Sequence, residues 1–387
     1  MHSVSDDETP LRVTIAASHR FHLNDLAREL LQEGMDVQFI SYVPREKAAY
    51  YGVPPEAQSS MLMVMLPILA WNRFLPRVLP RTRKRLNARM INWTAARLIK
   101  ECDVFICLSG LYVEAAKVAK ERFGAQVWLE RGSTHIMAQH RILSDIQGAT
   151  IPSAQDLARE KAGYLLADRI VVASEHVVES FRLESPSYSA KIIKIPYGAN
   201  LSEFPLMPRQ ALGSVCRILM VGGWSLRKGC DVLIEAISEM SGVHLTHVGS
   251  IQDCDFPDGH PSFQHFDPVP QSQLAVFYRN AHLAVLPSRE EGLAMVQMQS
   301  LSCGLPLVGT TMSGARDLAL SDRLARNIFV CSPGDAEELR NAIAAAIDAL
   351  RSSTAPALTE EDRLLLGWKR YGRDYAAQLR RIVKRSR

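Results

Sequence analysis

The chain has 387 residues, of which 47% are hydrophobic and 22% charged, a composition typical of a soluble globular protein with enough apolar residues for two cores. The longest apolar run, 61–71, is too short for a membrane-spanning helix and contains Pro67, and the polar residues 1–10 do not resemble a secretory signal. The net charge of +4 at pH 7 conceals one strongly basic segment at 57–100.

Strand and helix patterns alternate in two series along the chain. In the first series we expect strands at 12–17, 37–40, 104–108, 126–129, 170–173 and 192–195, and helices at 23–32, 112–122, 155–167 and 175–182. In the second we expect strands at 217–221, 243–248, 283–286, 305–308 and 328–331, and helices at 229–240, 271–279, 293–302, 335–350 and 368–384. Such alternation predicts an α/β fold with two parallel sheets, each covered by helices on both faces.

Prolines and a glycine at 196–208 interrupt the periodicity between the two series, so the domain boundary is predicted there. We expect a disordered N-terminus at 1–10, one domain at 11–203, a second at 204–365 and a C-terminal helical segment at 366–387.

The most informative stretch is 283–308, which reads as a buried strand, an acidic loop, a helix and a second strand. The loop and the helix start bring the carboxylate of Glu291 and free backbone N–H groups into one crevice, and such N–H groups with the helix dipole favour a phosphate. Gly304 is expected to end the helix. An ordinary βαβ unit with a capped helix is the alternative interpretation.

Two further segments place polar residues at the ends of strands. After the strand at 217–221, a loop carries Arg227 and Lys228 just before a helix, where the helix dipole disfavours cations, so a binding role is favoured over a solvated pair. The strand near 126–129 runs into a turn with Glu130, Arg131 and His135. A single histidine is more often a packing or surface residue, but three polar groups beside a glycine favour a functional site.

These segments resemble the retaining glycosyltransferases of family 4. Pro287-Ser288, Glu291-Gly292 and Cys303-Gly304 match the family pattern P-S-x-x-E-G-[FL]-x-x-x-x-x-E-A-x-[AS]-C-G, with Gln299 in place of the second glutamate. Lys228 matches the lysine of the family's G-R-x(n)-K-G loop, while Gly223 stands where the arginine is usual and Arg227 is its substitute. Residues 130–136 resemble the signature E-R-G-S-[ST]-H-I.

The resemblance implies the GT-B fold, with two Rossmann-like doubly wound parallel-sheet domains facing a cleft and a C-terminal helix crossing back to the first domain. Residues 11–203 would then form the acceptor-binding domain, 204–365 the nucleotide-sugar-binding domain, and 366–387 a helix packed on the first domain.

The implied activity is transfer of a hexose-like residue from a nucleoside-diphosphate sugar to a hydroxyl, with retention of configuration; the acceptor that we expect is a lipid-linked saccharide, as in polysaccharide biosynthesis. The implied site has catalytic residues Glu291, His135 and Arg131, donor-binding residues Arg227, Lys228, Gly292, Leu293, Gln299 and Gly223, and acceptor-side residues Glu130, His19 and Arg20. A nucleotide-sugar epimerase of the same fold is an alternative. A catalytically silent sugar-nucleotide-binding protein is another, because the second glutamate is missing.

No cofactor and no metal are expected. Asp253, Asp255 and Asp258 form neither an EF-hand loop nor an Asp-x-Asp pair, and no other cluster has convincing ligand spacing. The seven cysteines include no C-x-x-C pair, which favours reduced thiols in a cytosolic protein over a zinc site or disulfides.

The segment 57–100 contains nine Lys or Arg residues and no Asp or Glu. A solvated basic face is the simplest interpretation. Because the apolar run 61–71 precedes most of these cations, an anionic membrane surface contacted through 61–100 is the functional hypothesis that we favour. Nucleic acid is not expected, since interleaved aromatic residues and a recognised motif are lacking. The expected location is cytoplasmic, with peripheral attachment to the cytoplasmic face of the membrane.

Overall fold

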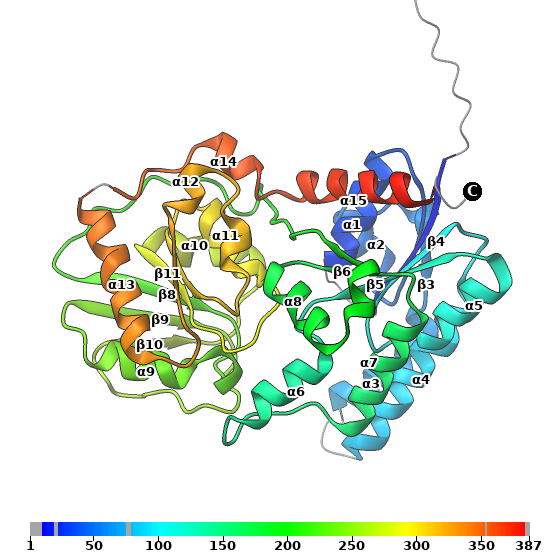
Figure 1. The fold of residues 1–387 in the computed structure, drawn as a ribbon, viewed down its shortest axis with the longest axis horizontal. Coiled ribbons are helices and arrows are strands. Elements are labelled where there is room, and N and C mark those ends of the chain that lie inside the picture. The colour runs from blue at the N-terminus through cyan, green and yellow to red at the C-terminus, as the bar shows by residue number, and fades with distance from the viewer. Residues whose placement is uncertain (1–9, 19–21, 75–78, 353, 384–387) are drawn as a thin grey trace, which may run out of the picture. The chain divides into compact units, whose positions relative to one another are not determined.

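A computed structural model describes residues 10–18, 22–74, 79–352 and 354–383 (Figure 1). The chain forms two compact units, the first made of described residues within 1–130, 154–171 and 372–387, and the second of those within 131–153 and 172–371. The predicted disorder of 1–10 concerns residues that, apart from Pro10, lie outside the described part. The predicted domain limits at 203 and 365 stay predictions.

One sheet has seven strands in the order β3-β2-β1-β4-β5-β6-β7. The strands are β1 (Arg12–Ala16), β2 (Asp36–Ser41), β3 (Gln58–Ser60), β4 (Val104–Leu108), β5 (Gln126–Arg131), β6 (Arg169–Val172) and β7 (Ile192–Lys194). Strand β1 pairs in parallel with both β2 and β4, so the strand order reverses direction between β1 and β4.

The other sheet has six strands in the order β10-β9-β8-β11-β12-β13. The strands are β8 (Cys216–Val221), β9 (Val243–Val248), β10 (Phe263–Phe266), β11 (Leu283–Leu286), β12 (Leu307–Thr310) and β13 (Ile328–Cys331). All of its pairings are parallel, and β8 lies between β9 and β11. The two parallel sheets confirm the predicted α/β fold class.

Most helices begin and end within two residues of their predicted limits. The helices of the described residues are α1 (His22–Gln32), α2 (Arg45–Tyr50), α3 (Leu62–Phe74), α4 (Pro80–Leu98), α5 (Val113–Phe123), α6 (Ile136–Ser144), α7 (Ala154–Leu166), α8 (Glu175–Glu184), α9 (Cys230–Ser238), α10 (Gln271–Asn280), α11 (Met295–Ser302), α12 (Asp322–Ala325), α13 (Ala336–Arg351), α14 (Glu360–Leu364) and α15 (Trp368–Val383). No helix was predicted at α2, α3, α4, α6, α12 or α14. Helix α3 is apolar on nearly all sides and contains Pro67, so the usual amphipathic signal is missing.

Both faces of the second sheet are covered by helices. Helices α9 and α13 pack on one face through residues such as Leu233 and Ile343, and α10 packs on the other through Leu274 and Tyr278. This three-layer arrangement buries β8 and β11 at the centre of the sheet, where the ends of the strands are held rigidly.

The C-terminal helix returns to the first unit, as the resemblance implied. From Gly372 onward α15 belongs to that unit, where Arg380 bonds with the carbonyl oxygen of Glu33 at the end of α1 at 2.6 Å. Tyr375 packs against Trp128 of β5, with ring centroids 5.7 Å apart.

All seven cysteines are buried free thiols, as the absence of paired motifs predicted. No helix in the described part of the chain is long and apolar enough to cross a bilayer.

Candidate functional site

The second sheet presents two polar loops side by side. Because β8 and β11 are adjacent and parallel, the loops that follow them, 222–229 and 287–294, leave the same edge of the sheet. The chain reaches β9 on one side of β8 and β11 on the other, which makes this the point where strand order reverses. In open α/β sheets such points are where ligands usually bind.

The two loops carry a compact cluster of opposite charges. Lys228 Nζ contacts the Oε2 atom of Glu291, and an Arg227 guanidinium nitrogen lies 3.6 Å from the same oxygen. Arg227 also donates to the Oε2 atom of Glu290 at 3.0 Å and to the Glu290 carbonyl at 3.2 Å. The predicted cations and the predicted carboxylate are therefore in direct contact, together with a second glutamate that the sequence analysis did not select.

Glu290 connects these loops to the segment 131–139. Its Oε1 atom accepts from the Ser133 hydroxyl at 2.6 Å, from the Thr134 backbone N–H at 3.0 Å and from the Thr134 hydroxyl at 2.8 Å. Its Oε2 atom accepts from the Gln139 amide at 3.0 Å, in addition to Arg227. With five hydrogen bonds and no exposed side-chain surface, Glu290 is a fixed negative charge at the centre of the cluster.

The charges shift the pKa values of both glutamates downward. Burial alone would raise the pKa of Glu290, but Arg227 and the hydrogen bonds from Ser133 and Thr134 outweigh it and lower the pKa to about 2. Burial likewise opposes ionisation of Glu291, and the charges of Lys228 and Arg227 overcome it, so its pKa is also lowered. Both carboxylates are ionised at neutral pH.

The backbone around Glu291 is held from two directions. His176, at the start of α8, hydrogen-bonds to the Glu291 carbonyl at 2.6 Å. Burial lowers the pKa of His176 and so favours the neutral ring. Because a carbonyl oxygen only accepts, the Nε2 atom carries the proton and donates. Glu291 N–H donates to the Met312 carbonyl at 3.0 Å. These two hydrogen bonds hold the backbone of Glu291 where its side chain can reach Lys228.

Gly292 allows the loop at 287–294 to pack closely against the segment 131–139. A Cβ atom at Gly292 would lie 2.3 Å from the carbonyl oxygen of Gly132, a distance that no side chain tolerates. The hydroxyl of Ser174 donates to the Gly292 carbonyl at 2.8 Å. Glycine here is needed because backbone packs directly on backbone.

Helix α11 starts two residues later than predicted, at Met295, and Gly304 follows its end with a φ of +88°, as expected. Its N-cap residue, Ala294, provides no side-chain acceptor. Within the described residues, the backbone N–H groups of Gly292, Leu293 and Ala294 have no hydrogen-bond acceptor. Such groups at a helix start are available to an anion.

Three predicted donor-binding residues make other contacts. The amide oxygen of Gln299 accepts from the Tyr278 hydroxyl at 3.1 Å, and the Gln299 residue is only 4% exposed. Leu293 is buried, at 3% exposure. Gly223 lies against the Gln252 amide, 2.4 Å from where its Cβ atom would be. Among the described residues, none of these three hydrogen-bonds with Arg227, Lys228, Glu290 or Glu291, and their donor-binding roles stay predictions.

Arg131 and His135 are in the second unit and shape the segment 131–139. Arg131 donates to the Thr134 carbonyl and to Gln139, which in turn bonds Glu290. His135 caps α6, because its Nδ1 atom accepts from the Met137 N–H at 3.3 Å, and its ring packs edge-on against Phe181. At 3% exposure His135 is positioned as a packing residue, and its catalytic role stays a prediction.

Among the predicted acceptor-side residues, Glu130 belongs to the first unit. Glu130 pairs with His22 at 3.0 Å, and both side chains are buried. His19 and Arg20 lie outside the described residues. The acceptor-side assignment therefore stays a prediction.

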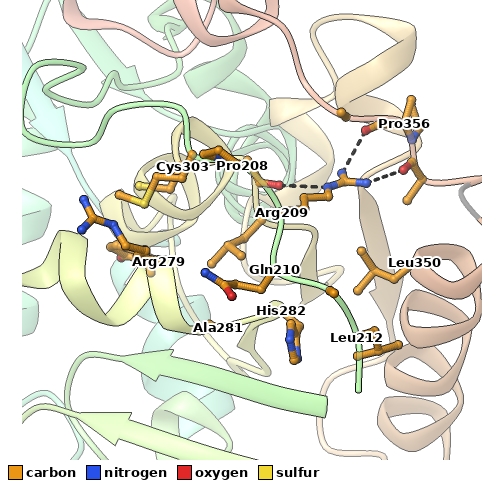
Figure 2. A pocket seen from close by; sticks show the side chains of 17 residues that line it. Pro208, Arg209, Gln210, Leu212, Arg279, Ala281, His282, Cys303, Leu350 and Pro356 are labelled. Atoms are coloured by element: carbon orange, nitrogen blue, oxygen red, sulfur yellow. Dashed lines mark hydrogen bonds between the residues drawn. The ribbon is translucent and has the colours of Figure 1, made fainter. Parts of the chain in front are cut away.

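A separate pocket lies at the opposite edge of the second sheet (Figure 2). Its volume is about 380 Å³, and it is lined by residues that precede strands, among them His282 before β11 and Leu305 before β12. Arg209 beside it donates to the carbonyls of Ala355 and Pro356 and to that of Gly304. This arginine ties together three chain segments, and the pocket is remote from the charged loops along the strands.

Sequence reasoning missed Glu290 and His176. The adjacent residues Glu290 and Glu291 are visible in the sequence, but the family pattern contains only the glutamate that matches Glu291. His176 could not be found from its neighbours in the sequence, because its contact with the Glu291 carbonyl joins residues 115 positions apart.

Comparison with known proteins identifies relatives of the region that contains the two charged loops. Residues 216–349 match the family model of Glycosyl transferases group 1. D-inositol 3-phosphate glycosyltransferase of Xylanimonas cellulosilytica is 25% identical over 239 residues, covering 51% of this chain and 56% of the relative. The chain thus spans little more than half the length of that relative.

Two solved structures resemble the whole chain. Sucrose-phosphate synthase of Thermosynechococcus elongatus has a TM-score of 0.66 at 16% identity, covering 97% of this chain and 100% of that chain. Anabaena HepE, solved in complex with UDP and glucose, has a TM-score of 0.64 at 15% identity, covering 96% and 100%. At these identities the likeness shows the fold, and it confirms the GT-B fold predicted from the sequence.

Proposed function

We propose that this GT-B glycosyltransferase, whose residues 216–349 match the glycosyl transferases of group 1, transfers a hexose-like residue from a nucleoside-diphosphate sugar to a hydroxyl with retention of configuration. The observation that carries the proposal is the contact of Arg227 and Lys228 with Glu291, at the edge where β8 and β11 end.

The two cations and the helix start suit the diphosphate of a sugar nucleotide. As the bond between the anomeric carbon and the diphosphate oxygen breaks, its electron pair passes to that oxygen, and Arg227 and Lys228 would stabilise the growing charge. The backbone N–H groups of 292–294 add fixed donors. Arg227, Lys228 and these N–H groups would supply the positive charge that a metal ion supplies in other enzymes. The proposed reaction therefore needs no metal ion.

Glu291 would act on the other side of the breaking bond. A carboxylate stabilises the oxocarbenium-like character that develops at the anomeric carbon. The acceptor oxygen then bonds to this carbon on the face that the diphosphate leaves, and the hydroxyl proton passes to the departing phosphate oxygen. Because the pKa of Glu291 is lowered, its negative charge is present throughout the neutral range.

A panel of nucleoside-diphosphate sugars, each assayed with and without hydroxyl acceptors, tests this activity. We expect nucleoside diphosphate release that requires an acceptor and persists in excess chelator. The variant Lys228→Ala should be impaired, while Lys369→Ala, which removes an exposed lysine outside the cluster, should match the parent. Conversion of the sugar to its epimer without an acceptor would identify an epimerase, and binding without turnover a silent binding protein.

Peripheral attachment to an anionic membrane, which would bring the protein to a lipid-linked acceptor, is the second part of the proposal. Helix α3 exposes Met63 at 78% and Phe74 at 77%, and α4 exposes Trp93 at 52%. Helix α4, which packs against α3, carries the basic residues Arg83, Lys84, Arg85, Arg89 and Arg97. Cations together with exposed apolar side chains are typical of surfaces that enter the headgroup region.

Co-sedimentation with vesicles tests the attachment. Binding should require anionic lipid, weaken as salt rises, and weaken when Met63 and Phe74 are both changed to Ser. The matched control is Leu183→Ser, which removes a 76%-exposed leucine from α8 instead. Equal binding to neutral and anionic vesicles would contradict the hypothesis.

A further inference from the structure

A groove lies between α4, α5 and α7 in the first unit, where α4 runs beside α5 (Figure 1). Its volume is about 760 Å³, within the range of ligand sites in proteins. Helix α4 contributes one face, with Arg85, Arg89 and Asn92 at helical spacing, and the facing helices contribute Lys117 and Arg159. The groove is thus built from three elements rather than from one helix surface.

Positive charge dominates the groove. Four of its lining residues are Lys or Arg, and Glu114 is the one carboxylate among the residues that line it. The nearby Asp156 is held by Arg159 at 2.5 Å and by Lys84 at 3.2 Å. The Nε atom of Arg159 is buried and has no hydrogen-bond partner among the described residues. Asp156 thus occupies only part of the Arg159 guanidinium, and a partly paired cation in a basic groove favours an anionic ligand.

The floor of the groove is held in place by hydrogen bonds. Asn92 Oδ1 accepts from the backbone N–H groups of Glu114 and Ala115, at 3.1 Å each, and so joins α4 to the start of α5. Since the oxygen of this amide is occupied, its NH₂ group can donate to a ligand. Arg85 donates to Gln155 at 3.2 Å, which joins α4 to α7.

Helix α4, which forms one face of the groove, also exposes two apolar side chains. Leu86 and Trp93, seven residues apart on α4, follow directly after the groove residues Arg85 and Asn92 and are 39% and 52% exposed. The Arg97 guanidinium lies over the Trp93 ring, 3.5 Å from its centroid. Inorganic phosphate would gain nothing from such neighbours, whereas a lipid can bury acyl chains against them while a tryptophan sits at the headgroup level.

We propose that this groove binds the phosphate-bearing headgroup of an anionic phospholipid. The inference rests on the proposed membrane attachment and gives that attachment a defined site. It adds Lys117 and Arg159, which lie outside the basic segment 57–100.

The test compares lysines that carry equal charge. Binding of the full chain to phosphatidylcholine vesicles containing phosphatidylglycerol is measured for the parent, Lys117→Gln and Lys161→Gln. Lys161 is an exposed residue of α7 that does not line the groove. We expect Lys117→Gln to weaken binding about fivefold or more, and Lys161→Gln less than twofold. Glycerol 3-phosphate should also weaken the parent's binding more than sodium chloride of the same ionic strength.

The other outcomes separate the hypotheses. Equal losses in the two lysine variants would overturn the groove and leave general membrane attachment intact. Failure of the parent to bind these vesicles would overturn both, without touching sugar transfer to soluble acceptors. Thermal stabilisation by glycerol 3-phosphate without vesicle binding would assign the groove to a soluble phosphate, and binding of single-stranded DNA in place of vesicles would assign it to nucleic acid.

Discussion

Replacing Glu290 with glutamine probes the fixed charge at the centre of the cluster. Every group around this carboxylate donates a hydrogen bond: the Ser133 hydroxyl, the Thr134 N–H and hydroxyl, the Gln139 amide and the Arg227 guanidinium. A glutamine must turn its NH₂ group toward some of these donors. In one orientation the NH₂ group faces the Thr134 backbone N–H, and in the other it faces the Arg227 guanidinium. Neither group can accept a hydrogen bond from it.

The expected loss of stability follows from the pKa. A carboxyl group whose pKa falls from 4.5 to about 2 on folding contributes about 3 kcal/mol at neutral pH. The amide loses this contribution and leaves at least one buried donor unpaired, so Glu290→Gln should lower the free energy of unfolding by about 2–4 kcal/mol. Because the folded-state pKa is depressed, the contribution is complete above pH 4.5 and disappears as pH falls through about 2.

Denaturant unfolding of the parent and the variant, followed from pH 7 down to pH 2.5, measures both features. The difference between the two proteins should be largest at neutral pH and shrink below pH 4.5. Glu239→Gln is the control, because Glu239 is 59% exposed in its pair with Arg340 and should change stability by less than about 0.5 kcal/mol. A Glu290→Gln difference below that value, or one that is constant with pH, would refute the reasoning.

Three predictions concern turnover of the proposed reaction. Lys228→Ala should cost about 2–4 kcal/mol of transition-state stabilisation in kcat/KM, and a near-parental value would remove the diphosphate assignment. Glu291→Gln should reduce kcat about a hundredfold or more, while nucleotide affinity, measured by calorimetry, changes little. Full activity of this variant would contradict the catalytic role of Glu291. Gln299→Glu should change kcat less than about tenfold, because the glutamate can still accept from Tyr278. Activity that appears only in this variant would mean that the parent is a silent binding protein.

The strands and most helices could be predicted because their signals are local. Buried parallel strands such as β4 and β11 are short apolar runs, and both have the predicted limits. The short strand β3 has the sequence Gln-Ser-Ser and pairs with β2. Because the strand depends on this pairing, no pattern in its own residues predicts it. Helix α6 begins at a histidine cap, which is not among the usual capping residues.

The candidate site was predictable only where chemistry follows directly from neighbouring residues. Arg227 and Lys228 stood out because two adjacent cations before a helix are unfavourable without a partner. The role of Glu290 could not be read in the same way, because its partners Ser133 and Thr134 lie more than 150 positions away. The two segments meet only in the fold, where Gly292 packs directly on Gly132.

The adjacent glutamates are suited to different tasks. Glu290 is surrounded by five donors from two segments, so its charge orients Arg227 and the loop at 131–139 without being available to a ligand. Glu291 has no such shell: its side chain is 11% exposed and its carboxylate contacts the two cations. A diphosphate arriving at these cations competes with Glu291 for Lys228, whereas Arg227 keeps its bond to Glu290. On the proposed function, donor binding therefore exchanges one partner of Lys228 for another and releases the Glu291 carboxylate to face the sugar.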